Sequence, residues 1–478
     1  MNHKLIRYTL GWVLGLEGLC MLLPFICSLV YKEQMYTIFG GSMLLCIILG
    51  IILIQSRPKN KSMYAKEGYT IVALSWIVMS VFGAIPFVLS GAIPRIDQAL
   101  FETASGFTTT GASVLSDVEA LPKSLLFWRS FTHWIGGMGI LVFLVAIIQL
   151  SGSTNMHLVK AESTGPKVGK LVPKIRSTAK ILYGIYLAMT VTEIILLKLG
   201  GLDWFEALTL SFGTAGTGGF GVKNSGCADY TSYQQIVIAV FMMLFGIDFS
   251  FYYAILMRKF RQLLHYEEVK TYLGIIIFAT VVIALNCLRV FSNTFDSFKN
   301  AFFQVSSIIT TTGYSTADFD KWPEFSKALL VTLMFVGACA GSTGGGIKVS
   351  RIIILLKSVA KEIKIAAHPN RIYKISMNGK LVEHETVRAI NVFMCAYVAI
   401  YFISLLIISF DNMDFTTNFT AVVATLNNIG PGLAGVGPTK NFSEYSVLST
   451  IILTVNMLIG RLEIFPMIVL MSPHTWKK

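Results

Sequence analysis

Four short segments of the chain share a motif in which threonine or asparagine comes shortly before a glycine. Each lies between two long apolar stretches, and the four motifs are Phe107–Ser113, Ala215–Phe220, Ile309–Ser315 and Leu426–Gly432. A cation that enters a narrow pore must exchange its water for other oxygens, and four backbone segments can provide them as a ring of carbonyls. Glycine allows the backbone angles and the close approach that such a ring requires. The motifs therefore indicate a cation pore.

Each motif contributes three consecutive residues to the predicted filter, and threonine hydroxyls add oxygens there without adding charge. The predicted ion-binding residues are Thr109, Thr110, Gly111, Thr217, Gly218, Gly219, Thr311, Thr312, Gly313, Asn428, Ile429 and Gly430. The motifs hold no ring of acids, which argues against a site for divalent cations. Two adjacent glycines leave the second motif uncertain by one residue, and we prefer Gly219 because Gly219-Phe220 mirrors Gly313-Tyr314.

The dozen residues before each glycine predict a short apolar helix. Such a helix is about 18 Å long, which is too short to cross a hydrocarbon core of about 30 Å. Each segment must therefore enter the membrane and return. The C-terminal ends of these helices would point toward the pore centre, where the negative end of the helix dipole favours a cation.

The composition places these loops in a bilayer. The chain has 478 residues, 54% hydrophobic and 14% charged, and a mean hydropathy of +0.66, whereas a soluble domain carries about 25% charged residues. Ten stretches approach the length of a membrane-spanning helix. They lie near residues 8–30, 37–55, 68–91, 124–150, 179–201, 234–257, 271–291, 328–355, 387–410 and 446–471. We predict an all-α membrane protein in the lipid bilayer.

The net charge of +13 reflects topology rather than a nucleic-acid partner. Most of the 39 Lys and Arg residues fall in alternate loops, which the positive-inside rule assigns to the cytoplasm. These loops are 1–8, 56–67, 151–180, 258–270, 348–388 and the C-terminal tail. Both termini are therefore expected in the cytoplasm, and the four glycine motifs are expected to face outward.

The chain repeats a unit of span, half-helix, loop and span four times, and the second spans again contain glycines. In the third repeat these glycines predict an irregular intramembrane loop that acts as a gate, because three consecutive glycines would unwind a helix. The predicted gate residues are Gly341, Ser342, Thr343, Gly344, Gly345, Gly346, Lys348 and Arg461. We expect Arg461 to face the conduction path just below the filter, and the alternative is a structural pair with an acid such as Asp248.

Long motifs throughout the chain resemble those of the Trk/Ktr/HKT superfamily of cation transporters, closest to its bacterial TrkH-like branch. The motifs that carry the resemblance include Lys66–Tyr69, Trp134–Ile140, Thr310–Thr316, Ala340–Lys348, Asn428–Gly432 and Gly460–Phe465. The resemblance implies four M1–P–M2 repeats around a single central pore, preceded by an N-terminal two-helix pair. The corresponding divisions are 1–60, 61–160, 161–262, 263–375 and 376–478.

The same resemblance implies gated potassium uptake across the bacterial cytoplasmic (inner) membrane. Filter glycines carry over onto Gly111, Gly219, Gly313 and Gly430, and glycine at all four positions fits potassium. The resemblance also implies a homodimer and a cytoplasmic nucleotide-binding regulatory ring as a partner. The chain itself has no Walker A motif and no G-x-G-x-x-G placed between a strand and a helix, so any nucleotide must be bound by that partner.

Other functions remain as alternatives. A proton- or sodium-coupled secondary transporter would be expected to show inverted repeats and titratable residues at the midplane, and a membrane sensor or scaffold would leave the four motifs unexplained. No zinc motif, nucleophile elbow or pair of catalytic carboxylates is present, so we expect neither an enzyme nor a bound cofactor. Glu17 and Glu193 are expected to reach the membrane interface, and His133 to be structural.

Overall fold

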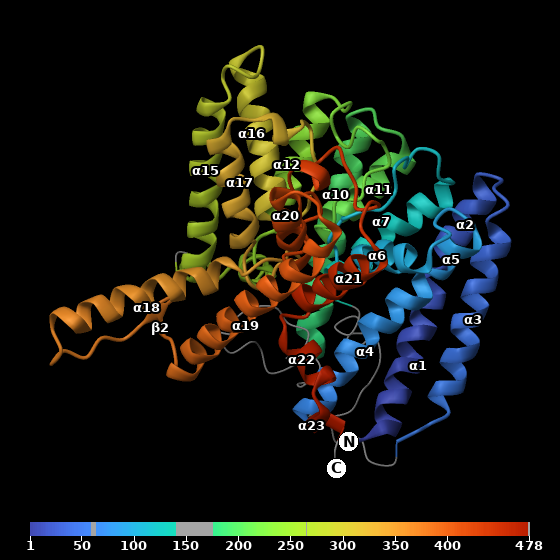
Figure 1. Ribbon diagram of the computed structural model, residues 1–478, viewed down its shortest axis with the longest axis horizontal. Helices are drawn as coiled ribbons and strands as arrows, with labels where there is room; N and C mark the ends of the chain where they lie inside the picture. The colour runs from blue at the N-terminus through green and yellow to red at the C-terminus, as the bar shows by residue number, and fades with distance from the viewer. Residues whose placement is uncertain (59–63, 140–174, 264, 477–478) are drawn as a thin grey trace.

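The computed structural model describes residues 1–58, 64–139, 175–263 and 265–476. Its described part is helical apart from one short hairpin, which confirms the predicted all-α membrane fold (Figure 1). Six described helices are long and apolar enough to cross a membrane, or seven if the bent pair Ser232–Phe245 and Phe249–Leu256 is one span. The end of the predicted span 124–150 and most of the predicted loop 151–180 lie outside the described residues.

The N-terminal pair consists of α1 (His3–Cys20), continued by α2 (Leu22–Val30), and α3 (Tyr36–Ile54). These helices lie at one edge of the molecule (Figure 1). Glycine allows α1 and α3 to approach closely, because a Cβ at Gly11 would lie 2.7 Å from the carbonyl oxygen of Gly50. This close approach explains why an apolar pair can pack without large side chains at the crossing point.

Four sets of helices follow, and each contains a first span, a short pore helix and a second span. The first two sets are α4 (Ala65–Gly83), α5 (Ile85–Leu89), α6 (Ile96–Phe107) and α7 (Lys123–Gly137), then α10 (Ile175–Leu199), α11 (Trp204–Gly216), α12 (Ser232–Phe245), α13 (Phe249–Leu256) and α14 (Phe260–Leu263). The last two are α15 (Glu267–Asn286), α16 (Thr294–Ile309), η1 (Phe319–Lys321), α17 (Glu324–Val336) and α18 (Val349–Ala367), then α19 (His384–Ile408), η2 (Ser409–Asp411), α20 (Phe415–Leu426), η3 (Ala434–Val436), α21 (Val447–Arg461), α22 (Phe465–Met471) and α23 (Pro473–Trp476).

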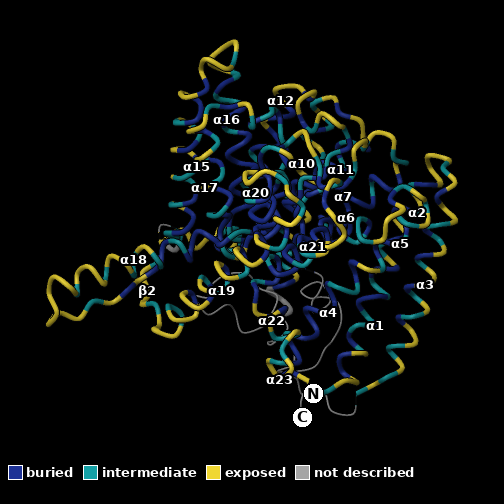
Figure 2. Tube along the Cα trace, viewed as in Figure 1, coloured by how far each residue is buried: buried dark blue, intermediate teal, exposed yellow. Residues whose placement is uncertain are grey.

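The short pore helices are α6, α11, α16 and α20. Three of them begin at a side chain that accepts a hydrogen bond from a free N–H of the first turn: Asp203, Asn293 and Asp414. The fourth, α6, begins at Arg95 without such a bond. All four helices bury most of their residues in the centre of the molecule, where Figure 2 shows the chain buried. Their C-terminal ends are packed by apolar side chains.

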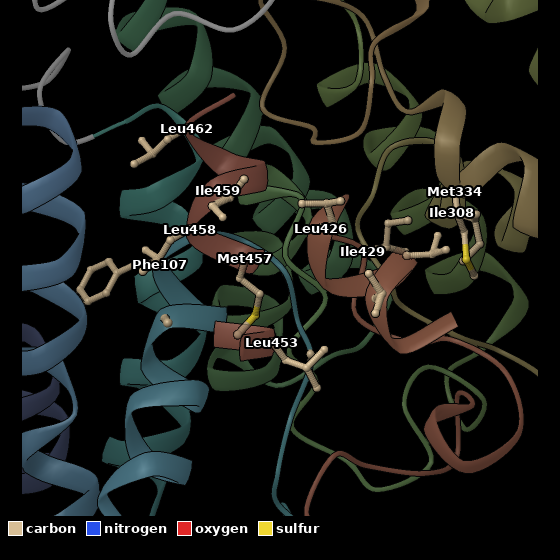
Figure 3. Packing of buried hydrophobic residues seen from close by; sticks show 14 of the residues in the cluster. Phe107, Ile308, Met334, Leu426, Ile429, Leu453, Met457, Leu458, Ile459 and Leu462 are labelled. Carbon is tan, nitrogen blue, oxygen red and sulfur yellow. The ribbon is translucent and has the colours of Figure 1, made fainter. Parts of the chain in front are cut away.

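Figure 3 shows this packing beside the fourth loop, where Leu426 and Ile429 lie between Met457 of α21 and Ile308 of α16. All four side chains are at most 1% exposed. These close-packed side chains leave little room for movement, so they hold the loop in one position. The core therefore supports the end of the fourth pore helix directly.

Two of the second spans break where the sequence predicted continuous helices, and a third is irregular where its glycines predicted a break. The predicted span 234–257 bends by 89° between α12 and α13, and the predicted span 446–471 is interrupted between α21 and α22. In the third set, residues 337–348 between α17 and α18 are irregular. Beyond α18 lies an antiparallel hairpin of β1 (Ser376–Met377) and β2 (Lys380–Leu381), and α18 and this hairpin project away from the helical body (Figure 1).

Candidate ion-conduction pathway

The four glycine loops adopt the same backbone conformation. The first of the three predicted filter residues has a positive φ in every loop: +55° at Thr109, +56° at Thr217, +59° at Thr311 and +56° at Asn428. The last, a glycine, also has a positive φ: +78° at Gly111, +79° at Gly219, +88° at Gly313 and +103° at Gly430. The middle residue does not. By this pattern Gly219, and not Gly218, is equivalent to the other three glycines.

These conformations are costly for ordinary side chains. A left-handed residue other than glycine costs roughly 1–2 kcal/mol, yet threonine or asparagine takes this conformation in each loop. Left-handed residues on both sides of the middle residue rotate the successive peptide planes so that their carbonyls can lie on one side. Such an arrangement suits coordination of a cation by backbone oxygens.

The four loops also contact one another in a closed ring. A Cβ added to each filter glycine would meet the carbonyl oxygen of the middle residue of the next loop. The distances are 2.0 Å from Gly111 to Gly218, 2.0 Å from Gly219 to Thr312, 2.1 Å from Gly313 to Ile429 and 2.8 Å from Gly430 to Thr110. Any side chain at these positions would therefore push neighbouring loops apart.

Side-chain hydroxyl groups form additional hydrogen bonds within and between the loops. The hydroxyls of Thr108 and Thr110 lie 2.8 Å apart, and Thr310 and Thr312 repeat this contact at 2.8 Å. The side-chain amide of Asn428 donates to the hydroxyl of Thr110 at 2.9 Å, which joins the fourth loop to the first. The three residues predicted in each loop thus come together, and the threonines at the middle positions bond to protein groups.

His133 supports the ring between the first and second loops. Its Nε2 accepts a hydrogen bond from the backbone N–H of Phe220 at 3.2 Å, so its proton lies on Nδ1, which faces the carbonyl oxygen of Gly106 at 2.7 Å. The imidazole is fully buried. The described residues hold no group of three His, Cys, Asp or Glu side chains that could bind a metal ion, so His133 acts here as a structural link.

An ion pair that the sequence analysis missed lies behind the same two loops. Glu102 of α6 and Arg129 of α7 are joined at 2.8 Å, and their side chains are 0% and 2% exposed. The signal available in the sequence was an acid and a base in consecutive short helices, nine residues before Gly111 and eighteen residues after it. Sequence spacing gave no indication that the two would meet.

The irregular segment 337–348 lies against the third and fourth loops, just after their pore helices end. The backbone N–H of Gly345 donates to the hydroxyl of Thr311 at 2.6 Å, and that of Gly346 donates to the carbonyl of Asn427 at 3.1 Å. A Cβ at Gly345 would lie only 2.3 Å from the same carbonyl oxygen. Glycine is therefore required for the segment to approach the filter this closely.

Arg461 links this segment to the first repeat. Its guanidinium donates to the carbonyl of Thr343 at 2.7 Å and to that of Gly137 at 2.9 Å, and it also bonds to the carbonyl of Gly136. Lys348 donates to the carbonyl of Gly344. The structure therefore places Arg461 beside residues 341–348, next to the four glycine loops.

On its other side the segment bonds to Glu268 and lies close to Asp248. Oε1 of Glu268, in the first turn of α15, accepts from the backbone N–H of Ala340 at 2.7 Å and from that of Ser350 at 3.0 Å. A Cβ at Gly341 would lie 2.6 Å from Oδ1 of Asp248, which itself accepts from the N–H of Ser250. Glu268 thus joins both flanks of the irregular segment.

Two other acids differ from the prediction. Glu17 and Glu193 were expected to reach the membrane interface, but they are 1% and 0% exposed. Glu17 packs beside Gly83, whose Cβ would lie 3.2 Å from Oε1 of the acid. The interpretation was wrong because the helices around α1 and α10 enclose side chains that hydropathy alone places near a helix end.

The comparisons with known proteins agree with this geometry. The family model described as TrkH, cation transport protein, matches residues 35–478. The chain is 35% identical to the Trk system potassium uptake protein TrkH of Escherichia coli strain K12, over 100% of both chains. It is 30% identical to the Trk system potassium uptake protein TrkG of the same strain, over 99% of each.

A solved structure is similar over the whole length. The crystal structure of the potassium transporter TrkH from Vibrio parahaemolyticus matches with a TM-score of 0.89 and 32% sequence identity, covering 100% of both chains. A match of this extent covers the N-terminal pair, the four repeats and the broken spans alike. The chain belongs to the TrkH family of cation transport proteins.

Proposed function

We propose that this protein takes up potassium through a gated, potassium-selective pore formed by its four re-entrant loops. The observation that carries the proposal is the closed ring in which each filter glycine faces a carbonyl of the next loop. Four loops with one conformation can present equivalent backbone oxygens to a dehydrated cation. Potassium is the transported substrate, and no cofactor is required for this mechanism.

The names of the similar proteins support the same substrate. Relatives from Escherichia coli and Halomonas elongata are Trk system potassium uptake proteins, and the similar solved structure is a potassium transporter. The absence of acidic residues from the twelve filter positions also favours a monovalent cation over a divalent one.

The test is cation flux into proteoliposomes that contain the purified protein. We expect uptake of potassium and rubidium down a concentration gradient, with much slower uptake of sodium. Uptake that requires an imposed proton or sodium gradient would instead support a coupled secondary transporter. Vesicles without flux of any cation would contradict both, and empty vesicles provide the control.

We propose that residues 341–346, with Lys348 and Arg461, form the gate. The segment is irregular, contacts the third and fourth loops, and is tied to the first repeat by Arg461. Segments of this kind can open when a few backbone angles change, because glycine has no side chain to obstruct the motion.

We also propose the assembly and topology that the family resemblance implied. The protein would be a homodimer in the cytoplasmic membrane, with both termini and the basic loops inside, and a nucleotide-binding ring would dock on the inner face. The repeat limits 61–160, 161–262, 263–375 and 376–478 belong to the same proposal. Cysteine-accessibility labelling of single-cysteine variants in intact cells tests the topology, since outer-loop positions should react and termini should not.

A further inference from the structure

The ion pair of Glu102 and Arg129 is buried and lies outside the predicted filter and gate. Nε and Nη2 of the guanidinium both lie 2.8 Å from Oε1 of the carboxylate. Among the ion pairs of the described residues, this pair alone has both side chains at most 2% exposed. Two desolvated charges need additional hydrogen bonds to be stable, and those bonds identify what the pair holds.

The carboxylate holds the first loop just beyond its filter glycine. Its two oxygens accept from the hydroxyl of Ser113 at 3.0 and 3.1 Å, and Oε2 accepts from the backbone N–H of Val114 at 3.0 Å. Ser113 is two residues after Gly111. Glu102 therefore fixes the exit of the first loop to its own pore helix.

The guanidinium holds the second loop at the equivalent position. Nη1 of Arg129 donates to the carbonyl of Gly221 at 3.3 Å, and Gly221 is two residues after Gly219. Its guanidinium carbon lies 4.0 Å from the ring centroid of Phe220, and Nη2 also reaches the hydroxyl of Ser113 at 3.3 Å. One ion pair thus fastens equivalent points of two neighbouring filter loops.

The other repeats lack the residues for such a pair. The positions nine residues before the filter glycines are occupied by Leu210, Gln304 and Ala421. Between the second and third loops, the hydroxyl of Tyr314 instead donates to the carbonyls of Leu210 and Phe220 at 3.2 and 3.3 Å. The charged contact is therefore specific to the junction of the first and second loops in the part of the chain described.

We infer that Glu102 and Arg129 are positioning residues that set the separation of the first two loops and thereby contribute to cation selectivity. This inference rests on the proposed function, because it assumes that the four loops form the filter. The pair carries no net charge toward the pore, so it acts through loop position. A planar guanidinium can bond Glu102 and Gly221 at once, whereas a lysine ammonium lacks this fixed fork.

The test is the ratio of sodium to potassium flux in proteoliposomes containing the Arg129→Lys variant. Loss of about one charge-assisted hydrogen bond should raise this ratio by about tenfold, with potassium flux similar to that of the unmodified protein. The matched control is Arg95→Lys at the start of α6, where the ion pair with Asp97 has side chains that are 44% and 14% exposed. The control should leave the ratio unchanged.

A second variant keeps the inference testable if Arg129→Lys fails to fold. Replacing Glu102 and Arg129 together by glutamine removes both charges and leaves neither unpaired, and this variant should also raise the ratio. If a folded variant of either kind keeps the original ratio, or lowers both fluxes equally, the inference is overturned and the pair is structural only. A lack of potassium preference in the unmodified protein would contradict the proposed function instead.

Discussion

The four filter loops have the same conformation in every repeat, whereas the second spans break differently from one repeat to the next. The four loops have nearly the same φ angles at corresponding residues, whereas α12 and α13 bend by 89° and twelve residues separate α17 from α18. An ion surrounded by four loops favours equal oxygens and hence equal conformations. The proposed gate needs only one segment that moves, so the segments that follow the filter loops can differ from repeat to repeat.

The largest effect is expected from breaking the equality of the loops. In Gly313→Ser the new Cβ would lie 2.1 Å from the carbonyl oxygen of Ile429 and 2.9 Å from Cδ of Pro431. The left-handed backbone adds roughly 1–2 kcal/mol of strain. We expect the loops to separate and sodium to be admitted, measured as a sodium-to-potassium flux ratio at least about tenfold higher.

Gly274→Ser in α15 is the matched control, because a Cβ there would meet nothing within 4 Å. It should conduct and discriminate normally. Gly430→Ser sharpens the comparison, since its Cβ would lie 2.8 Å from the nearest carbonyl oxygen, against 2.0–2.1 Å in the other loops. Its effect should be the mildest of the four, and an unchanged potassium preference in Gly313→Ser would contradict the assignment of that glycine.

The next largest effect is expected in the irregular segment that contains Gly341–Gly346. Deleting Gly341–Gly346, or replacing it by an alanine-rich helix, should give flux that no longer responds to the proposed nucleotide-binding ring. The reason is that Gly345 and Gly346 would no longer bond to the third and fourth loops. The measurement is flux with and without the partner ring and its nucleotide, and retained regulation would show that the gate lies elsewhere.

The shared conformation of the four glycine loops could be anticipated from the sequence because its requirement is local. A glycine that must approach a neighbouring carbonyl leaves the same motif in every repeat, so Gly111, Gly219, Gly313 and Gly430 align with one another from their neighbouring residues alone. The membrane fold was similarly evident, because an apolar span is a property of consecutive residues.

The glycines at 341–346 did predict the irregular segment of the third set, but the break between α21 and α22 could not be anticipated, because it depends on contacts between distant segments. Glu463 and Ile464 connect α21 and α22 with φ angles of +54° and +72°, although neither is a residue that usually adopts this conformation. Ile464 is 1% exposed, and Glu463 pairs with Arg351 of α18. Tertiary packing thus maintains a backbone that the local sequence disfavours.

A smaller effect is expected at Arg461, which links the irregular segment to the first repeat. In Arg461→Ala the carbonyls of Gly136, Gly137 and Thr343 lose their shared donor. The inner segment should then open more often and the local positive charge would be absent, so potassium flux per channel should rise severalfold. Arg461→Lys, which retains the charge, should raise it less. A folded alanine variant that conducts at or below the original rate would contradict this.

The smallest effect concerns the pore helices, which are alike in length but begin differently. The hydroxyl and the backbone N–H of Thr417 donate to the carboxylate of Asp414 at the start of α20, and these bonds lower the pKa of Asp414. Stability from a lowered pKa is present above the unfolded-state value of about 3.9 and is lost as the pH falls through the lower folded-state value.

Asp414→Ala should therefore cost about 1 kcal/mol at neutral pH, and the cost should shrink as the carboxyl becomes protonated. Thermal unfolding of the detergent-solubilised protein between about pH 3 and pH 7 measures this, over a range that brackets the ordinary pKa of an aspartate. Thr231→Ala at the start of α12 is the control, because its hydroxyl accepts from the backbone N–H of Gln234 without ionising, so its cost should not change with pH. An equal cost at both ends of the pH range would mean that Asp414 acts through packing, and the pore helices would then not differ in how their first turns are stabilised.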